Sequence, residues 1–174
     1  ATPTGNVNEF DITYRVIVSN TSTAKAFYDL SDTLKFGLGT TIGAVVASYE
    51  MGDGFSGTDN TGSFDGQSNY LISDDEMLEV GRSDTFQVKV TFTIDPEVLA
   101  ANPAAVDCDV TSDDPDGHTG LRNIAAVSDG VPDDDAEDCE EIPMPAVDIS
   151  KVIVTSATPT GNVNEFDITY RVIV

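Results

Sequence analysis

An identical stretch of eighteen residues opens and closes this chain. The letters "ATPTGNVNEFDITYRVIV" fill residues 1–18 and occur again at residues 157–174. Because Ala157 repeats Ala1, the period is 157 − 1 = 156 residues, the length of a whole domain and far longer than a solenoid repeat. Identity over such a stretch predicts a tandem array of near-identical domains. The alternative is an artefactual duplication.

The second half of the repeated stretch has an apolar side chain at every second position. In Phe10–Val18 every second residue is apolar and faces one way, and Phe86–Ile94 alternates in the same manner. A period of two predicts strands with one buried face. We expect further strands at Ala26–Phe36, Ile42–Glu50, Ser68–Ile72, Ala104–Val110, Leu121–Ser128 and Val147–Val154.

The segments between these strands are rich in Gly, Asn, Asp and Ser, the residues that turns require. A single helical turn is expected at Pro96–Ala101, with Asp95 as its cap and Pro96 in the first position. Many short strands joined by glycine-rich turns predict an all-β fold, an antiparallel β-sandwich.

The stretch Glu140–Lys151 has the composition of a domain junction. Pro143 and Pro145 end the preceding strand and stiffen the connection. We therefore expect residues 1–142 to form one sandwich that lacks its first strand in this window. Residues 143–145 would be a proline linker, and residues 146–174 the first two strands of the next repeat. The equivalent of the missing strand is Ala146–Ser156.

Three motifs resemble a known family of repeats. They read "DITYRVIVSNTSTAKAFYDLSDTL", "DTFQVKVTFTID" and "LRNIAAVSDG", and together they are similar to the surface-protein repeat called domain of unknown function eleven. One departure is Lys35, where that family has proline after Asp-Thr-Leu. The resemblance implies an immunoglobulin-like sandwich, repeated in tandem on bacterial or archaeal cell surfaces, with no catalytic residue.

The charge of the chain excludes several classes of partner. There are 31 acidic and 8 basic residues, a formal net charge of −23. Nucleic acid is excluded because binding phosphates needs clustered Lys and Arg, and an anionic membrane surface is disfavoured for the same reason. No apolar run is long enough to cross a bilayer, so we expect no membrane insertion in this segment.

The chain has two cysteines, Cys108 and Cys139, both in acidic surroundings. Two Cys with little His nearby make a poor metal site. A disulfide between them is therefore predicted, which favours an oxidising, extracellular or cell-surface location. The alternative is a pair of unpaired thiols.

Two acidic runs around these cysteines are candidates for binding Ca²⁺. Hard cations take about six to eight oxygen ligands, and a disulfide would bring the two runs together. The spacing does not match an EF-hand, and the alternative is a solvated acidic face. A weaker candidate is the loop with Asp53, Asp59 and Asp65. The candidate ligands are Asp107, Asp109, Asp113, Asp114, Asp116, Asp133, Asp134 and Asp135.

A covalent cross-link is a sharper hypothesis. Period two places Lys151 on the apolar face of its strand and Asn123 on the inward face of Leu121–Ser128. Burial makes an amine more nucleophilic, and a nearby protonated acid, for which Asp32 is the candidate, would polarise the Asn amide. The product would be a Lys–Asn isopeptide bond. The alternative is that Lys151 extends to solvent at a strand end while Asn123 binds backbone.

Motifs for catalysis are weak. His118 is the single histidine and lies in a Gly/Asp-rich loop. No Ser or Cys lies in a recognisable nucleophile motif, so the sequence does not predict a Ser–His–Asp triad. We expect no enzyme.

The sequon at Asn20–Ser22 is an acceptor pattern for N-linked glycan in a turn.

Together these features predict the structural repeat unit of an extracellular fibre, stalk or filament on a prokaryotic surface. Its partners would be copies of itself, in tandem or head-to-tail. The alternative is an adhesin repeat that binds carbohydrate or a host surface, which an exposed aromatic cluster would favour; a secreted hydrolase ranks third. The aromatic residues in question are Tyr49, Phe55, Phe64 and Tyr70.

Overall fold

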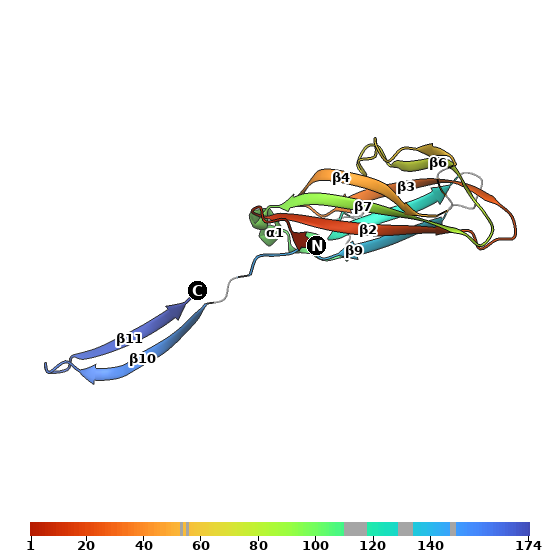
Figure 1. Ribbon diagram of the computed structural model, residues 1–174. Helices are drawn as coiled ribbons and strands as arrows, with labels where there is room; N and C mark the ends of the chain where they lie inside the picture. The colour runs from red at the N-terminus through yellow and green to blue at the C-terminus, as the bar shows by residue number, and fades with distance from the viewer. Residues whose placement is uncertain (53, 55, 110–117, 129–133, 147–148) are drawn as a thin grey trace. The chain divides into compact units, whose positions relative to one another are not determined.

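The computed structural model of the chain describes residues 1–52, 54, 56–109, 118–128, 134–146 and 149–174. Its described residues separate into two compact units, Ala1–Pro143 and Met144–Val174. The division falls within the Pro143–Pro145 segment that the sequence marks as a linker (Figure 1). The two units are described separately below.

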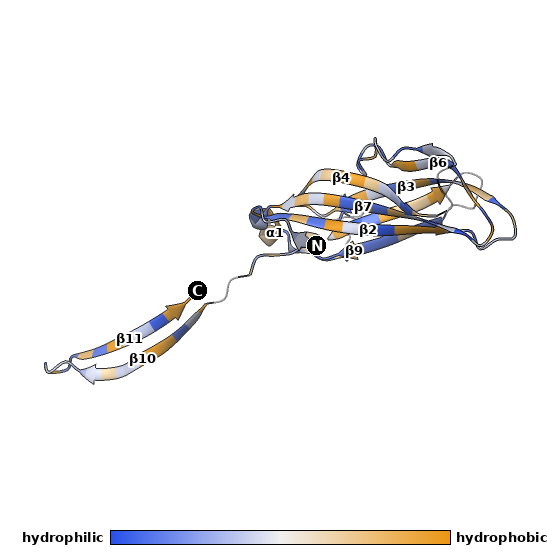
Figure 2. Ribbon diagram, viewed as in Figure 1, coloured by the Kyte–Doolittle hydropathy of each residue, from blue (hydrophilic) through white to orange (hydrophobic). Residues whose placement is uncertain are grey.

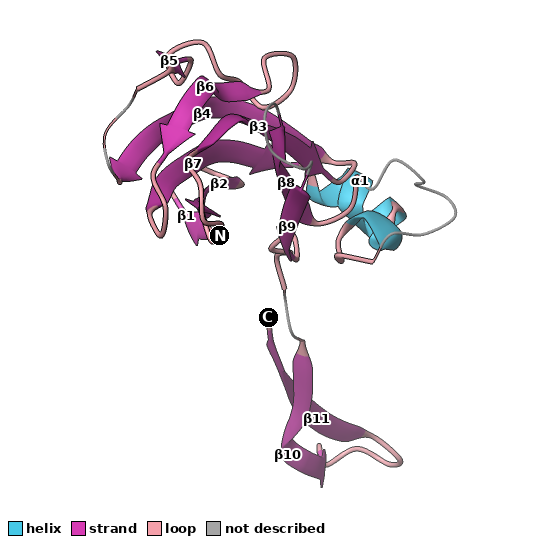
Figure 3. Cartoon of the chain, turned by 90° about the vertical axis from the view of Figure 1, so that its right-hand side faces the viewer, coloured by secondary structure: helices cyan, strands magenta, loops and turns pink. Residues whose placement is uncertain are grey.

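The first unit contains two antiparallel sheets packed as a sandwich (Figures 1 and 3). The predicted all-β, immunoglobulin-like class is thereby confirmed. One sheet has the order β1-β2-β7-β4 and consists of β1 (Thr2–Pro3), β2 (Glu9–Ser19), β7 (Ser83–Ile94) and β4 (Thr40–Met51). The other has the order β5-β6-β3-β8-β9 and consists of β5 (Thr58–Asp59), β6 (Leu71–Leu78), β3 (Ala26–Phe36), β8 (Leu121–Ser128) and β9 (Asp134–Glu140).

The core lies between the two sheets and is built by the alternating residues. The side chains of Phe86, Val88, Val90 and Phe92 on β7 are fully buried, and Ile12 and Tyr14 on β2 face the same layer. Figure 2 shows apolar and polar residues alternating along both strands. This pattern is the expected result of a pleated strand with one face on a core.

Helical structure in the described residues is confined to α1 (Pro96–Ala101) and the 3₁₀ turn η1 (Pro103–Ala105) (Figure 3). The Asp95 side chain caps α1 by accepting from the backbone N–H groups of Glu97 and Val98, as predicted. None of these helices is long and apolar enough to span a membrane.

One strand prediction is wrong at all of its described residues, and another is wrong in its bounds. The segment expected as a strand at Ala104–Val110 begins with η1, because Pro103 opens a 3₁₀ turn whose last amides bond back to Asn102 and Pro103. The strand expected at Ser68–Ile72 instead begins at Leu71 and continues to Leu78. The residues before it form a turn in which Asp65 accepts from the backbone N–H groups of Gln67, Ser68 and Asn69.

The second unit is a two-stranded antiparallel hairpin of β10 (Ser150–Pro159) and β11 (Phe166–Ile173). All of its strand residues are exposed. A single hairpin is at best marginally stable in water without a third strand or a packed face. This unit therefore has the elements of a sandwich but not its core.

Candidate functional site

The outer edge of β2 is open over most of its length. On that side β1 pairs only at its two residues, Thr2 opposite Asp11 and Pro3 opposite Phe10. Among the described residues, no strand pairs with the rest of that edge, although the other edge pairs with β7 throughout, from Glu9 to Ser19. An unpaired edge presents a row of backbone donors and acceptors that can accept another strand.

Two hollows lie in line along this open edge, between β2 and the strands of the opposite sheet. One of about 160 Å³ is lined by Tyr14 and Val16 from β2, by Asn123 from β8 and by residues of β9. The next, of about 140 Å³, is lined by Val16 and Val18 together with Leu30 and Val127. The side of the sandwich where β2 faces β9 is therefore incompletely filled.

The hairpin of the second unit contains a copy of β2 with a full partner. Strand β11 has the same sequence as the corresponding part of β2, and its pairs Thr158 with Asp167 and Pro159 with Phe166 repeat the pairs of β1 with β2. From there β10 continues upstream to Ser150, opposite Ile173. In the hairpin, the strand that precedes the copy of β2 in the sequence is β10. The pairs of β10 with β11 therefore show in which register such a strand lies against β2.

Identical residues differ in burial between the two units. Ile12 and Tyr14 are 8% and 7% exposed, whereas their copies Ile168 and Tyr170 are 42% and 47% exposed. Because the sequences are the same, the difference comes from the missing sheet partners of the hairpin. The apolar face of β11 is the face that a sandwich buries.

Asp32 and Asn123 form a buried polar pair behind the first hollow. In the ladder of β3 and β8, Leu34 lies opposite Asn123 and Asp32 lies opposite Ala125, so the two side chains are diagonal neighbours on the inward face. Nδ2 of Asn123 donates to Oδ2 of Asp32 over 2.9 Å. The predicted acid and the predicted amide are therefore brought together.

Both members of the pair are incompletely satisfied. Asp32 is 0% and Asn123 4% exposed, yet Oδ1 of each has no hydrogen-bond partner among the described residues. Burial raises the pKa of Asp32 to about 7, although the hydrogen bond from Asn123 acts in the opposite direction. A substantial fraction of Asp32 is therefore a neutral carboxylic acid near neutral pH, the form that can donate a proton.

Other buried acids have different surroundings. Asp84 accepts hydrogen bonds from the hydroxyls of Tyr28 and Tyr49. Glu76 accepts from the backbone N–H groups of Ser56 and Gly57. Both acids are 0% exposed and hold neighbouring elements in place. Neither acid was predicted to be buried, although Asp84 is in phase with the inward-facing Phe86 of β7 and Glu76 with the inward-facing Leu78 of β6.

Lys151 is exposed in the hairpin, and its Nζ lies 4.2 Å from the centroid of the Tyr170 ring. It therefore lies on the same face of the hairpin as Tyr170. The copy of that tyrosine in the first unit is Tyr14, which lines the first hollow together with Asn123. Lys151 thus belongs to the face that carries the inward residues, as the sequence predicts.

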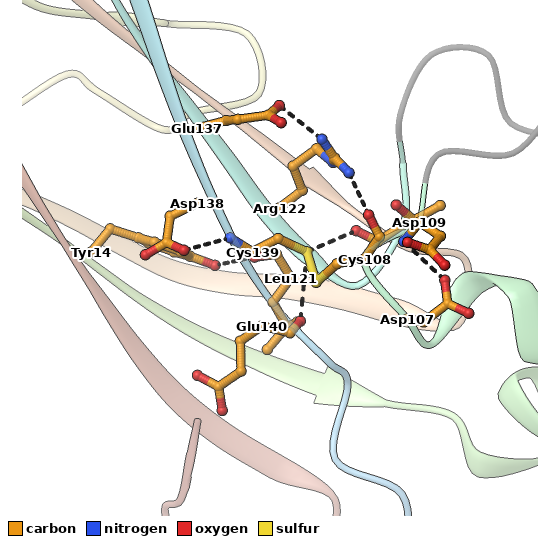
Figure 4. Close-up of a disulfide and its surroundings, with 11 residues drawn as sticks. Tyr14, Asp107, Cys108, Asp109, Leu121, Arg122, Glu137, Asp138, Cys139 and Glu140 are labelled. Atoms are coloured by element: carbon orange, nitrogen blue, oxygen red, sulfur yellow. Dashed lines mark hydrogen bonds and ion pairs between the residues drawn. A yellow bond between two sulfur atoms is a disulfide. The ribbon is translucent and has the colours of Figure 1, made fainter.

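The predicted disulfide is present between Cys108 and Cys139, with a Cα–Cα distance of 5.9 Å. Figure 4 shows it beside Arg122, whose guanidinium donates to Glu137 over 2.8 Å and to the carbonyl oxygen of Cys108 over 2.6 Å. The disulfide and the arginine together fasten the segment after η1 to the edge strand β9. A disulfide is typical of a compartment outside the reducing cytosol.

The candidate calcium ligands are only partly described. Asp107 accepts from the backbone N–H of Asp109, and Asp134 and Asp135 lie exposed on β9. Within the described ranges, no three acidic, His or Cys side chains are grouped closely enough to hold a metal ion.

In the second candidate loop, Asp59 accepts from the N–H of Thr61, and Asp65 caps its own turn. The ligands Asp113, Asp114, Asp116 and Asp133, and Asp53 of the second loop, lie outside the described residues.

Asn20 is 6% exposed and occupies the turn after β2. Its Nδ2 donates to the carbonyl oxygens of Ala24 and Leu78, and its Oδ1 accepts from the N–H of Ser22. A glycan on Nδ2 would displace at least one of these hydrogen bonds. The folded turn therefore does not present the amide, and attachment would have to precede folding.

His118 is exposed and lines a surface hollow of about 610 Å³ together with Tyr70 and Gln67. Of the aromatic residues that an adhesin would use, Phe64 is buried and Tyr49 packs edge-on against Phe86. Phe55 lies outside the described residues. Among the described members of that set, Tyr70 is the most exposed, at 43%.

Comparison with protein-family models, with curated protein sequences and with solved structures finds no match. The resemblance to the surface-protein repeat stays a prediction from its motifs.

Proposed function

We propose that this chain belongs to a tandem array of 156-residue sandwiches that forms an extracellular fibre, stalk or filament. One observation carries the proposal: the open edge of β2 in the first unit is the edge that β10 covers on an identical strand in the second unit. Each sandwich would begin with a strand like β10, and that strand would occupy the two hollows between β2 and β9.

The burial of side chains supports this arrangement. Residues opposite one another in an antiparallel pair point to the same face. Ile153 lies opposite Tyr170 in the hairpin, so a strand of this sequence on β2 would direct its copy of Ile153 to the core side, beside Tyr14. Filling the hollows with apolar side chains would gain roughly 25 cal/mol per Å² of apolar surface removed from water.

The other features are compatible with an extracellular fibre. The disulfide favours an oxidising compartment. Large negative charge keeps long chains soluble and discourages lateral association. The proline-bearing connection at Pro143–Pro145 restricts how one sandwich can follow another.

The first test adds the proposed strand. A chain is made in which the sequence of residues 146–156, "AVDISKVIVTS", precedes Ala1; we call it the extended chain. We expect a higher unfolding temperature than for the original chain and slower amide hydrogen exchange along β2. A matched control carries the same segment with its copies of Ile149 and Ile153 changed to aspartate, which should remove the gain. Equal stability of the original and extended chains would contradict the strand assignment.

The second test concerns the array itself. Native material is sized on a denaturing, reducing gel and identified by mass spectrometry. The proposal expects a species much larger than 18.4 kDa, giving mainly one set of peptides, with one peptide spanning Pro143–Pro145. A band near one period would overturn the covalent array.

A further inference from the structure

We infer that the lysine of the added first strand, the copy of Lys151, forms an isopeptide bond with the side chain of Asn123, with Asp32 as the acid. This inference rests on the proposed function, because the lysine reaches the site only if a strand like β10 covers β2. It adds a covalent modification site to each sandwich.

The register of the hairpin places the lysine. Lys151 lies opposite Val172, and the copy of Val172 in the first unit is Val16. Val16 lines the same hollow as Asn123 and packs against the core. Since directly opposed residues share a face, a lysine opposite Val16 enters the hollow from the open edge.

The tyrosine contact gives an independent indication of the same position. In the hairpin the Nζ of Lys151 lies 4.2 Å from the centre of the Tyr170 ring. Its copy Tyr14 lines the hollow beside Asn123 and donates from its hydroxyl to the carbonyl oxygen of Leu121, two residues before Asn123 on β8, over 2.7 Å. A lysine that keeps its tyrosine contact in the complete sandwich therefore lies near β8.

The positions of Asn123 and Asp32 relative to the hollow indicate different roles for the two residues. Asn123 lines the hollow, whereas Asp32 lies behind it, fully buried and in contact with the Asn123 amide. An amine entering from the edge therefore meets the amide carbon first. The free Oδ1 atoms of both side chains leave the carboxylic acid and the amide oxygen available for proton transfer.

The reaction balances without a cofactor or an oxidant. The neutral amine attacks Cγ of Asn123, so that the Cγ–Nζ bond forms and the Cγ–Nδ2 bond breaks. Asp32 in its acid form donates a proton to the amide and takes one from the attacking nitrogen, and so ends as it began. Nδ2 leaves as ammonia. Burial of the lysine favours its neutral, nucleophilic form. The fold holds the amine, the amide and the acid close together, which raises their effective concentration and so the rate of the reaction.

The test is the intact mass of the extended chain after folding. We expect a mass lower than that calculated by one molecule of ammonia, and after digestion a branched peptide that joins the added lysine to Asn123. Lys151 itself is an internal control, because the hairpin lacks copies of Asp32 and Asn123, and it should remain unmodified. Changing the added lysine to arginine, or Asp32→Ala, should abolish the mass loss, whereas Lys25→Arg at the surface should leave it unchanged.

The possible results separate this inference from the function on which it rests. If the added strand raises stability but the full calculated mass persists after prolonged incubation, the cross-link is wrong and the strand assignment stands. If the chain loses water instead of ammonia, Asp32 and not Asn123 is the acceptor, which overturns the assignment made here. If the added strand changes neither stability nor mass, the proposed function fails as well. The variant with arginine in place of the added lysine should keep most of the stabilisation that the added strand provides. Such a result would show that the variant folds although it cannot form the cross-link.

Discussion

Tyr14 donates from its hydroxyl to the carbonyl oxygen of Leu121 over 2.7 Å and so joins the two sheets beside the open edge. The bond is buried, and burial is the main reason that the pKa of Tyr14 is raised far above its ordinary value. The phenol therefore stays protonated and keeps its donor. An identical tyrosine, Tyr170, is half exposed on the hairpin.

Tyr14→Phe should lower the free energy of unfolding of the first unit by roughly 1 kcal/mol, because a buried hydrogen bond is lost and a carbonyl oxygen loses a partner. Tyr170→Phe is the matched control and should have no measurable effect. Denaturant titration monitored by circular dichroism measures both. Equal effects of the two substitutions would show that the Leu121 hydrogen bond does not stabilise the sandwich.

Asp32 should give the first unit a distinctive dependence on pH. Burial raises its pKa to about 7, against about 4 in an unfolded chain. Between these values the folded state holds a proton that the unfolded state has released. The stability due to this group is therefore complete below pH of about 4 and is lost as the pH rises through about 7.

Asp32→Asn should flatten this decline, as measured by urea unfolding at several pH values across the window. Asp11 is a control of opposite sign. Hydrogen bonds from Lys89 and then Thr91 lower the pKa of Asp11, so its contribution is lost as the pH falls. Asp11→Asn should therefore leave the decline between pH of about 4 and about 7 in place. A wild-type slope unchanged by Asp32→Asn would contradict the buried acid.

The disulfide should matter more than any single hydrogen bond. Cys108 and Cys139 are separated by 31 positions, and closing a loop of that length stabilises a fold by roughly 3–4 kcal/mol in the chain-entropy model. Replacing both cysteines with serine should lower the free energy of unfolding by about that amount. The wild-type chain in reducing agent should match the double variant; a reduced chain as stable as the oxidised one would show that the bond is dispensable.

The two units should behave differently when separated. Residues 1–143 have their own core, so this fragment should keep the cooperative unfolding transition of the whole chain. Residues 144–174 have only a hairpin, which should be largely unfolded in isolation. Nuclear magnetic resonance spectra of the two fragments measure this, and dispersed amide signals from residues 144–174 alone would contradict it.

The strands that the sequence predicts well have apolar residues at most positions of one face. Ala26–Phe36 and Leu121–Ser128 have the bounds expected from the pattern, because one face of each is buried in the core. Strand β9 was not among the predicted strands. It consists largely of acidic residues and is exposed at nearly every position, so it carries no alternation. Charged residues on an edge strand oppose unwanted pairing and also hide the strand from pattern analysis.

The candidate site was predictable only in part. Period two indicates that Asn123 faces inward, and the repeat indicates that a strand is missing beside β2. The contact between Asp32 and Asn123 depends on the register in which Leu34 lies opposite Asn123, and no local pattern specifies the pairing of strands so distant in sequence. The hollow arises from the spacing of β2 and β9 at the edges of two sheets, which is a property of the packed fold.

The position of Ala1 has a mechanical consequence. Ala1 lies beside Glu140, at the end of β9. In the proposed array, the strand that precedes Ala1 would begin opposite Ile17, at the other end of β2, if it kept the register of β10. The chain would then enter and leave each sandwich at opposite ends. Tension along the array would pull the first strand lengthwise past β2 and load the hydrogen bonds of that ladder in shear, all at once. We expect such a sandwich to resist extension far better than one whose edge strands peel apart bond by bond, and single-molecule pulling on the extended chain measures the difference.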